Sequence, residues 1–373
     1  MKVEDFVDVI DADFYTGVPD SQLRALCDYL MARYGLDPKH HLIAANEGNC
    51  TAIAAGYHMA TGKYPVVYMQ NSGEGNAINP IASLLHEKVY NIPVIFVIGW
   101  RGEPGIHDEP QHIYQGEVTL KLLEDMQIPY CVVAPDSDKE ALQSAWKELR
   151  ETLSNNRSVA FVIKKGSLSF EDKAAYGNAY TLVREKVIEQ IVEHSGTDPI
   201  VSTTGKISRE LFEIRERRGE GHQYDFLTVG SMGHSSSIAL GIALQKPEAR
   251  LWCIDGDGAM LMHMGSLAVI GSVQPDNLVH IVLNNCAHET VGGMPTAAGS
   301  LDIVGLAKSC GYQYAASVPG EEELQAELLR ARERRGLTLL EVKCAIGSRS
   351  DLGRPTTPAK ENKQNFMRYL STV

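Results

Sequence analysis

Twelve short runs rich in β-branched and other apolar residues recur along the chain, and stretches with helical patterning separate them. Runs that are apolar at consecutive positions suit strands buried on both faces, as in a parallel sheet covered by helices. Parallel strands need a long crossover connection, usually a helix, and the alternation supplies one each time. This feature restricts the chain to an α/β fold before any single residue is considered.

The twelve runs divide evenly between the two halves of the chain. The expected strands lie at 13–17, 41–45, 66–70, 94–99, 131–135 and 160–164, then at 199–204, 225–229, 251–256, 279–284, 312–316 and 339–344. The polar segment GSLSFEDKAAYGNAY (166–180) is the best linker between the halves. The sequence therefore predicts two doubly wound parallel-sheet domains, 1–165 and 183–373, joined by a linker at 166–182. The second domain carries a C-terminal tail, in which 347–363 is expected to be a loop or flap.

Composition narrows the range of functions. Lysine and arginine total 35 and aspartate and glutamate total 47, so the net charge is −12, and no long basic run occurs. We therefore expect neither nucleic acid nor a membrane as a partner. Seven scattered cysteines without a CxxC pair indicate reduced thiols. The acidic N-terminus lacks the apolar core of a signal peptide, and no run approaches the roughly 20 residues of a membrane span, so a cytoplasmic protein is expected.

The most informative stretch, residues 256–285, begins where an apolar strand ends. Asp257 lies between two glycines there, and Asn285 ends the next strand 28 residues later (285 minus 257). That separation is one β-α-β crossover, and both strands of such a unit emerge at the same edge of the sheet. Carboxylate and carboxamide oxygens suit magnesium or calcium, and a glycine-flanked turn suits a diphosphate. For GDG alone, a plain glycine-rich turn is the alternative.

GDG followed by NN after one crossover resembles the signature of the thiamine diphosphate-dependent decarboxylase and transketolase superfamily. Longer stretches resemble the phosphonopyruvate decarboxylase family: GDGAMLMHMG, HIVLNNCAHETVGGMPT, VYMQNSGEGNAINP, GWRGEPGIHDEPQH and, in the tail, RSDLGRPT. The resemblance implies a pyrimidine-binding domain, then a diphosphate-binding domain. Many relatives have a middle domain between these two, but the linker after residue 165 is too short for one. It also implies thiamine diphosphate and Mg²⁺ as cofactors, and at least a homodimer with the active site between subunits.

The resemblance assigns cofactor contacts residue by residue. The side chains of Asp257 and Asn285 would bind Mg²⁺, together with the backbone carbonyl of Ala287. Position alone would make Met232 an ordinary core residue, and Thr204 a strand-end turn. Through the GSMG segment the family pattern places Met232 under the cofactor instead. The remaining expected cofactor contacts are Thr204, Gly230, Gly256, Gly258 and Ala259.

Glu47 stands out as the one carboxylate in the small and apolar stretch AANEGNCTAIAAGYHMATG, residues 44–62. From the residues alone, Asn46 caps a helix and Glu47 lies favourably in its first turn. The resemblance instead makes Glu47 the acid that exchanges a proton with N1′ of the cofactor's aminopyrimidine. Burial would raise the pKa of Glu47 and favour that role. His112 and His288 are the other catalytic candidates.

The same resemblance implies decarboxylation of 3-phosphonopyruvate to phosphonoacetaldehyde and CO₂, in phosphonate biosynthesis. Sulfopyruvate or another 2-oxo acid is the alternative substrate. The pocket needs groups that bind the anionic end of such a substrate, and guanidinium matches phosphonate geometry well. The candidates are Asn71, Ser72, Asn76 and Arg101 on strand-end loops, and Arg349 and Arg354, which would form a lid in the tail.

Two alternatives come from other functional classes. A nicotinamide-binding Rossmann module would place GxGxxG after the first strand, where this chain has TGVPDSQL. A thiamine-dependent oxidoreductase with an iron–sulfur centre would require a CxxC cluster. Against the usual family wording NNGAHDSVGGQPT, the metal loop differs at Cys286, Glu289, Thr290 and Met294. These differences leave every expected ligand in place and bear on substrate preference.

Overall fold

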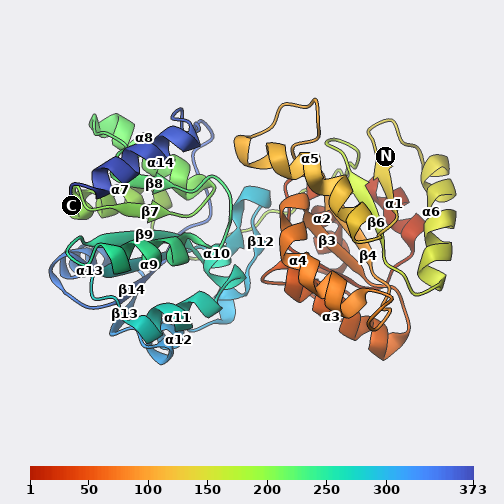
Figure 1. The fold of residues 1–373 in the computed structure, drawn as a ribbon, viewed down its shortest axis with the longest axis horizontal. Helices are drawn as coiled ribbons and strands as arrows, with labels where there is room; N and C mark the ends of the chain where they lie inside the picture. Colours follow the sequence, from red (N-terminus) through yellow and green to blue (C-terminus); the bar gives the residue numbers. More distant parts are fainter. The chain divides into compact units, whose positions relative to one another are not determined.

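The computed structural model describes residues 1–373 and divides into two compact units, Met1–Ala175 and Tyr176–Val373. Each unit is built on one six-stranded parallel sheet with helices on its faces (Figure 1). The division falls within the 166–182 segment of the sequence. The domain limits at 165 and 183 stay a prediction.

In the first unit the strands hydrogen-bond in the order β2-β1-β3-β4-β6-β5, and every neighbouring pair is parallel. The strands are β1 (Tyr15–Gly17), β2 (His41–Ile43), β3 (Val66–Gln70), β4 (Ile95–Gly99), β5 (Tyr130–Val133) and β6 (Val159–Ile163). The helices are α1 (Val3–Ile10), α2 (Arg24–Tyr34), α3 (Glu47–Thr61), α4 (Glu74–Pro80), α5 (Pro110–Asp125) and α6 (Lys139–Ser154), with short helical turns η1 (Asn71–Gly73) and η2 (Ile81–Leu85).

The core of this unit forms around the central strands. Every residue of β4 and β6 is buried, as expected for parallel strands covered on both faces. Phe161 of β6 lies 5.3 Å from the Phe6 ring of α1 and 5.8 Å from the Trp146 ring of α6, between ring centroids. Glu47, Asn71 and Arg101 follow closely after the carboxyl ends of β2, β3 and β4, respectively.

In the second unit the order is β13-β14-β10-β9-β7-β8, again parallel throughout. The strands are β7 (Ile200–Ser202), β8 (Asp225–Leu227), β9 (Leu251–Gly256), β10 (Leu278–Asn284), β13 (Tyr314–Val318) and β14 (Thr338–Lys343), plus an antiparallel pair, β11 (Ala287–His288) and β12 (Met294–Pro295). The helices are α7 (Arg184–Ser195), α8 (Lys206–Arg218), α9 (Ser235–Gln245), α10 (Asp257–Met262), α11 (Gly265–Val273), α12 (Ile303–Cys310), α13 (Glu321–Glu333) and α14 (Ala359–Leu370), with turns η3 (Glu289–Val291) and η4 (Ala297–Ser300).

Alternate residues of β9 enter two different apolar clusters. Trp252 and Ile254 pack with α7, α8 and α13, whereas Leu251 and Cys253 pack with α9, α11 and α12. Successive side chains of a strand point to opposite faces of a sheet, so both faces of this sheet are covered. The predicted doubly wound α/β fold, with twelve parallel strands in two sheets, is confirmed.

The C-terminal tail differs from the prediction. Residues through 363 were expected to lack regular structure, but helix α14 begins at Ala359. Its buried residues are Asn362 and Phe366, and Phe366 belongs to the apolar cluster that contains Leu251. The first turns of α14 are polar and its large apolar residues lie beyond residue 363, so the expected loop included only its polar beginning. None of the helices is long and apolar enough to cross a lipid bilayer.

Candidate active site

Glu47 is the first residue of α3, four residues after the end of β2. The side chain of Asn46 caps the helix by accepting the Asn49 N–H at 3.0 Å, as the sequence predicts. The Glu47 side chain is turned into the protein, since the residue is only 5% exposed. Burial raises the pKa of its carboxyl group, and a hydrogen bond from Asn76 offsets this only in part. Glu47 is therefore a buried acid at the carboxyl edge of the sheet.

The turn after β3 closes over the Glu47 carboxylate. Asn76 Nδ2 donates to Glu47 Oε2 at 2.8 Å. A methyl group at Gly73 would overlap the Glu47 carboxylate, so this close approach requires glycine. The sequence singled out Asn76 only as a substrate contact, because 29 residues separate it from Glu47 and their contact depends on how α3 and α4 pack.

Asn71 and Arg101 meet where β3 and β4 end. Asn71 Nδ2 donates to the Arg101 carbonyl at 2.8 Å and to Thr119 Oγ1 at 2.9 Å, while its Oδ1 accepts the Arg101 N–H at 3.1 Å. The two bonds to Arg101 connect the two strand ends, and the bond to Thr119 connects Asn71 to α5. The Asn71 side chain thus has partners at both of its polar atoms within the unit.

The Arg101 guanidinium forms a bidentate pair with Asp108, and its Nε lies 2.7 Å from Asp108 Oδ2. Burial raises the pKa of Asp108, but the hydrogen bonds and charge of Arg101 outweigh burial and lower it overall. Ser72 donates to Gln70 Oε1 at 2.9 Å. His112 lies in the first turn of α5, where its carbonyl packs against Gly102. Substrate contacts by these residues stay a prediction.

A second buried acid, Glu74, follows one residue after Gly73. Glu74 is 5% exposed and borders an apolar cavity of about 20 Å³ lined by Met69, Ala77 and Phe96 among others, which is room for about one water molecule. Its Oε2 accepts a long hydrogen bond of 3.3 Å from Gln115 Nε2, and its Oε1 has no hydrogen-bond partner. Burial raises the pKa of Glu74 from 4.5 to about 8.

Glu74→Gln should remove a pH-dependent loss of stability. The fold favours the neutral form of Glu74, so this group lowers the free energy of unfolding as pH rises from about 4.5 to about 8. The full contribution is on the order of 5 kcal/mol, since each pKa unit corresponds to about 1.4 kcal/mol. Urea unfolding at pH 5, 6.5 and 8 should show a smaller fall for Glu74→Gln than for wild type. Equal pH dependence in both proteins would contradict the assignment; Glu140→Gln, at an exposed site, is the control.

In the second unit, Asp257 begins α10 directly after β9 ends at Gly256. The residue is 3% exposed, and its Oδ2 accepts the Thr296 hydroxyl at 2.5 Å. Burial raises the pKa of Asp257 to about 6, against the effect of Thr296 and of the backbone N–H groups of Gly258 and Asn285. The Asn285 N–H therefore brings the two strand ends together, as the crossover spacing predicts. The role of Thr296 was not predicted, since 39 residues separate it from Asp257.

Asn285 follows β10 and forms three hydrogen bonds with neighbouring residues. Its Oδ1 accepts the Ala287 N–H at 3.0 Å, its Nδ2 donates to Glu289 Oε2 at 2.9 Å, and its carbonyl accepts Asn178 Nδ2 at 2.9 Å. The next residue, Cys286, adopts a left-handed φ of 57°, which turns the chain back toward Ala287. The Asn285 carboxamide thus has one defined orientation.

The GSMG segment, residues 230–233, lies against α10. A methyl group at Gly258 would sit 3.4 Å from the His288 ring and 3.5 Å from Met232 Cε, so these three residues surround one small space. Burial lowers the pKa of His288 to about 4, so its imidazole is neutral at pH 7. Thr204 donates to the carbonyl of Val229, next to Gly230, at 2.8 Å. Met232, Gly258 and His288 are therefore neighbours in space.

These groups fit the requirements of a Mg²⁺–diphosphate site. The oxygen-bearing side chains of Asp257 and Asn285 come together at adjacent strand ends, and both are buried. Oxygen donors of this kind match the preference of Mg²⁺. Gly256 and Gly258 flank Asp257, and the lack of a side chain at Gly258 leaves its backbone open beside Met232. The donor chemistry and the narrow glycine turn both suit the predicted cofactor.

Arg349 of the tail is paired with acidic side chains of its own unit. Arg349 pairs with Glu185 at 3.1 Å and Asp351 at 3.1 Å, and also with Glu213. Arg209 binds the carbonyls of Leu352 and Gly353. The segment 349–353 is therefore held on α7 and α8. Arg354 is exposed, and the role of both arginines as a lid stays a prediction.

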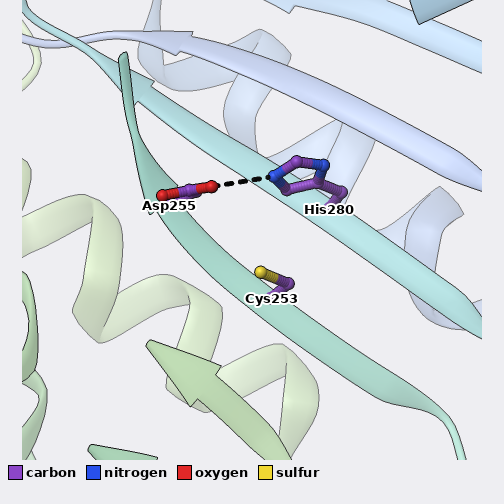
Figure 2. A group of neighbouring side chains, drawn as sticks. All are labelled: Cys253, Asp255 and His280. Atoms are coloured by element: carbon purple, nitrogen blue, oxygen red, sulfur yellow. Dashed lines mark hydrogen bonds and ion pairs between the residues drawn. The ribbon is translucent and has the colours of Figure 1, made fainter. Parts of the chain in front are cut away.

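Three buried polar side chains, Cys253, Asp255 and His280, lie close together on β9 and β10. Figure 2 shows Asp255 of β9 facing His280 of β10, with Cys253 two residues earlier on β9. Their potential metal-binding atoms lie within 4.8 Å of one another. However, Asp255 already accepts the Gly256 N–H at 2.9 Å and faces His280 Nε2 at 3.4 Å, while His280 Nδ1 lies 3.1 Å from the Tyr312 hydroxyl. We interpret this group as a structural network that supports the end of β9, where Asp257 begins α10.

Both units match models of one enzyme class. Residues 3–124 match the thiamine pyrophosphate enzyme N-terminal TPP binding domain, and residues 203–342 match the C-terminal TPP binding domain. The first match includes Glu47 and the second includes Asp257 and Asn285. Thiamine diphosphate is therefore the cofactor that both halves of the chain support.

Sequence identity to individual relatives makes the family assignment more specific. The phosphonopyruvate decarboxylase of Streptomyces viridochromogenes is 33% identical over 375 aligned residues, which cover 95% of this chain and 91% of the relative. The chain belongs to the family of thiamine diphosphate-dependent decarboxylases related to phosphonopyruvate decarboxylase. The phosphonopyruvate decarboxylase of Streptomyces hygroscopicus is also 33% identical, over 95% of this chain and 90% of the relative.

Sulfopyruvate decarboxylases are relatives as well. That of Methanosarcina acetivorans is 26% identical over 85% of each chain. The protein is therefore a thiamine diphosphate-dependent decarboxylase related to both enzyme types, and the predicted family and enzyme class are confirmed.

Proposed function

We propose that this family member decarboxylates 3-phosphonopyruvate to phosphonoacetaldehyde and CO₂, with thiamine diphosphate and Mg²⁺, in phosphonate biosynthesis. The observation that carries the proposal is the meeting of Asp257 and Asn285 at adjacent strand ends, in a chain aligned over 95% of its length with phosphonopyruvate decarboxylases. A buried acid, Glu47, on the other unit supports it.

The proposed site residues fall into three groups: ligands of the metal ion, contacts to the cofactor, and one acid that exchanges a proton. Asp257 and Asn285, with the Ala287 carbonyl, would hold Mg²⁺. When bound, thiamine diphosphate supplies a nucleophilic carbon and a cationic ring that accepts the electrons released with CO₂. Glu47 would exchange a proton with N1′ of the aminopyrimidine. The diphosphate contacts would be Gly256, Gly258 and Ala259, and the contacts to the rest of the cofactor would be Thr204, Gly230 and Met232.

Two histidines and three arginines are among the residues proposed to act on the substrate. His288 lies beside Gly258 and is neutral at pH 7, so its imidazole can donate or accept a hydrogen bond there. His112 would do so from the first unit. Arg101 is the strongest phosphonate-binding candidate, because its Nη1 makes only a 3.4 Å contact with Ser21 Oγ. The further substrate contacts proposed are Asn71, Ser72, Arg349 and Arg354.

We also propose that the protein works as at least a homodimer with the active site between subunits. Helix α3 exposes a face of small and apolar residues: Ala52, Gly56, Met59, which is 68% exposed, and Ala60. Such a face suits close packing against a second copy. Light scattering of the purified protein should give at least twice the 40.9 kDa chain mass. A monomer at working concentration would contradict this arrangement.

A substrate panel tests the activity. Purified protein with thiamine diphosphate and Mg²⁺ would receive 3-phosphonopyruvate, sulfopyruvate or pyruvate, and CO₂ and aldehyde would be measured. We expect kcat/KM for phosphonopyruvate to exceed the others by at least about tenfold, or about 1.4 kcal/mol in transition-state binding. Preference for sulfopyruvate would replace the substrate assignment. No turnover of any 2-oxo acid would contradict the proposed decarboxylation.

A further inference from the structure

The metal ligand Asn285 is connected to a buried ionic network. Glu289 Oε2 accepts Asn285 Nδ2 at 2.9 Å, and Glu289 also pairs with Arg184 and, at 2.8 Å, with Lys206. Arg184 in turn makes two 2.7 Å bonds to Glu210. The four charged side chains comprise two cations and two anions, so their net charge is zero.

Most of this network is buried. The side chains of Arg184, Glu210 and Glu289 are 5%, 1% and 8% exposed. Buried charges require partners of opposite sign, and each of these has one at hydrogen-bonding distance. Glu289 is therefore fixed between two cations, with its carboxylate directed at Asn285.

A carboxamide has two chemically different ends, and only its oxygen can bind a metal ion. An ionised carboxylate accepts hydrogen bonds but donates none, so it selects the NH₂ end of its neighbour. Glu289 thereby holds Asn285 Nδ2 on its own side and directs Oδ1 the other way. The Ala287 N–H, 3.0 Å from Oδ1, occupies one lone pair of that oxygen and leaves the second available.

We propose that Glu289 is a positioning residue that orients the Asn285 carboxamide for Mg²⁺, and that Arg184 and Lys206 hold Glu289 in place. The inference rests on the proposed function of Asn285 as a metal ligand. Partners of this kind typically change metal affinity by about 10- to 100-fold when removed.

A pair of variants separates positioning from general stability. Glu289→Gln and Glu210→Gln each remove one negative charge from the same network, but only Glu289 contacts Asn285. A glutamine at 289 can present its own NH₂ group to Asn285 and so no longer selects one orientation. Both variants should lose similar stability, whereas only Glu289→Gln should weaken metal binding.

The experiment titrates Mg²⁺ into full-length apoprotein at saturating thiamine diphosphate and measures cofactor binding by calorimetry. Glu289→Gln should raise the half-saturating Mg²⁺ concentration about 10- to 100-fold, and Glu210→Gln by less than about threefold. Saturating Mg²⁺ should restore cofactor binding in Glu289→Gln. Glu289→Asp, which keeps the charge and the acceptor, should lie between wild type and Glu289→Gln and serves if the latter does not fold.

The outcomes separate this inference from the proposed function. Wild-type Mg²⁺ affinity in Glu289→Gln, or an equal loss in Glu210→Gln, would overturn the positioning role alone. Absence of Mg²⁺-dependent cofactor binding in wild type would overturn the proposed function and this inference together.

Discussion

Glu47→Gln should lower kcat for decarboxylation by about 100- to 10,000-fold, the usual contribution of a positioned acid or base. Glutamine cannot exchange a proton with the cofactor ring. It can still accept the hydrogen bond that Asn76 donates to Glu47 at 2.8 Å, so the local structure should persist. The site is only 5% exposed, so water does not readily replace the lost carboxyl group. Because burial raises the pKa of Glu47, replacing it with a neutral side chain should leave the fold at least as stable as before.

The measurement combines steady-state kcat with thiamine diphosphate binding on the same preparation. Glu140→Gln is the matched control, because Glu140 is also a first-turn glutamate after a side-chain N-cap, on α6, but is exposed. We expect wild-type kcat in the control. Near-wild-type turnover in Glu47→Gln with bound cofactor would remove Glu47 from the proposed mechanism.

Asp257→Asn should abolish stabilisation by Mg²⁺ and thiamine diphosphate. Asparagine keeps the shape of the side chain and an acceptor for the Thr296 hydroxyl, which lies 2.5 Å from Asp257 Oδ2. It lacks the negative charge that Asp257 alone among the proposed ligands contributes to binding Mg²⁺. We expect Mg²⁺-dependent cofactor affinity to fall by more than the 10- to 100-fold typical of a supporting residue. A ligand at 100 times its Kd stabilises the folded state by about 2.7 kcal/mol, and this gain should be lost.

This loss of stabilisation can be measured by thermal unfolding. The protein would be heated with Mg²⁺ alone, with cofactor alone and with both together. Wild type should show its largest rise in Tm with both present. Asp276→Asn, at an exposed position just before β10, should behave like wild type. A wild-type Tm rise in Asp257→Asn would show that the metal binds elsewhere.

The fold was predictable because it depends on local patterns. Continuous apolar runs indicated buried parallel strands, and β9 and β10 are buried at nearly every position. The convergence of Asp257 and Asn285 followed from one crossover length and the common edge of parallel strands. The Asn46 cap and the place of Glu47 in the first turn followed from local helix-end chemistry.

The supporting contacts were not predictable, because they join residues far apart in the sequence. Glu289 meets Arg184 across 105 positions, and Thr296 meets Asp257 across 39. Such contacts depend on how helices and loops pack on the sheet, which residue patterns do not encode. The acidic partners of Arg101 and Arg349 were missed for a related reason, since an arginine in a loop carries no sign of which carboxylate it binds.

The dependence of CO₂ release on both cofactors tests the proposed activity most directly. Apoprotein prepared with a chelator would receive 3-phosphonopyruvate with thiamine diphosphate, Mg²⁺, both or neither. We predict CO₂ and phosphonoacetaldehyde in equal amounts only when both are present, and none from Glu47→Gln or Asp257→Asn above about 1% of the wild-type rate. Equal CO₂ release without thiamine diphosphate, or no release with both present, would contradict the assignment.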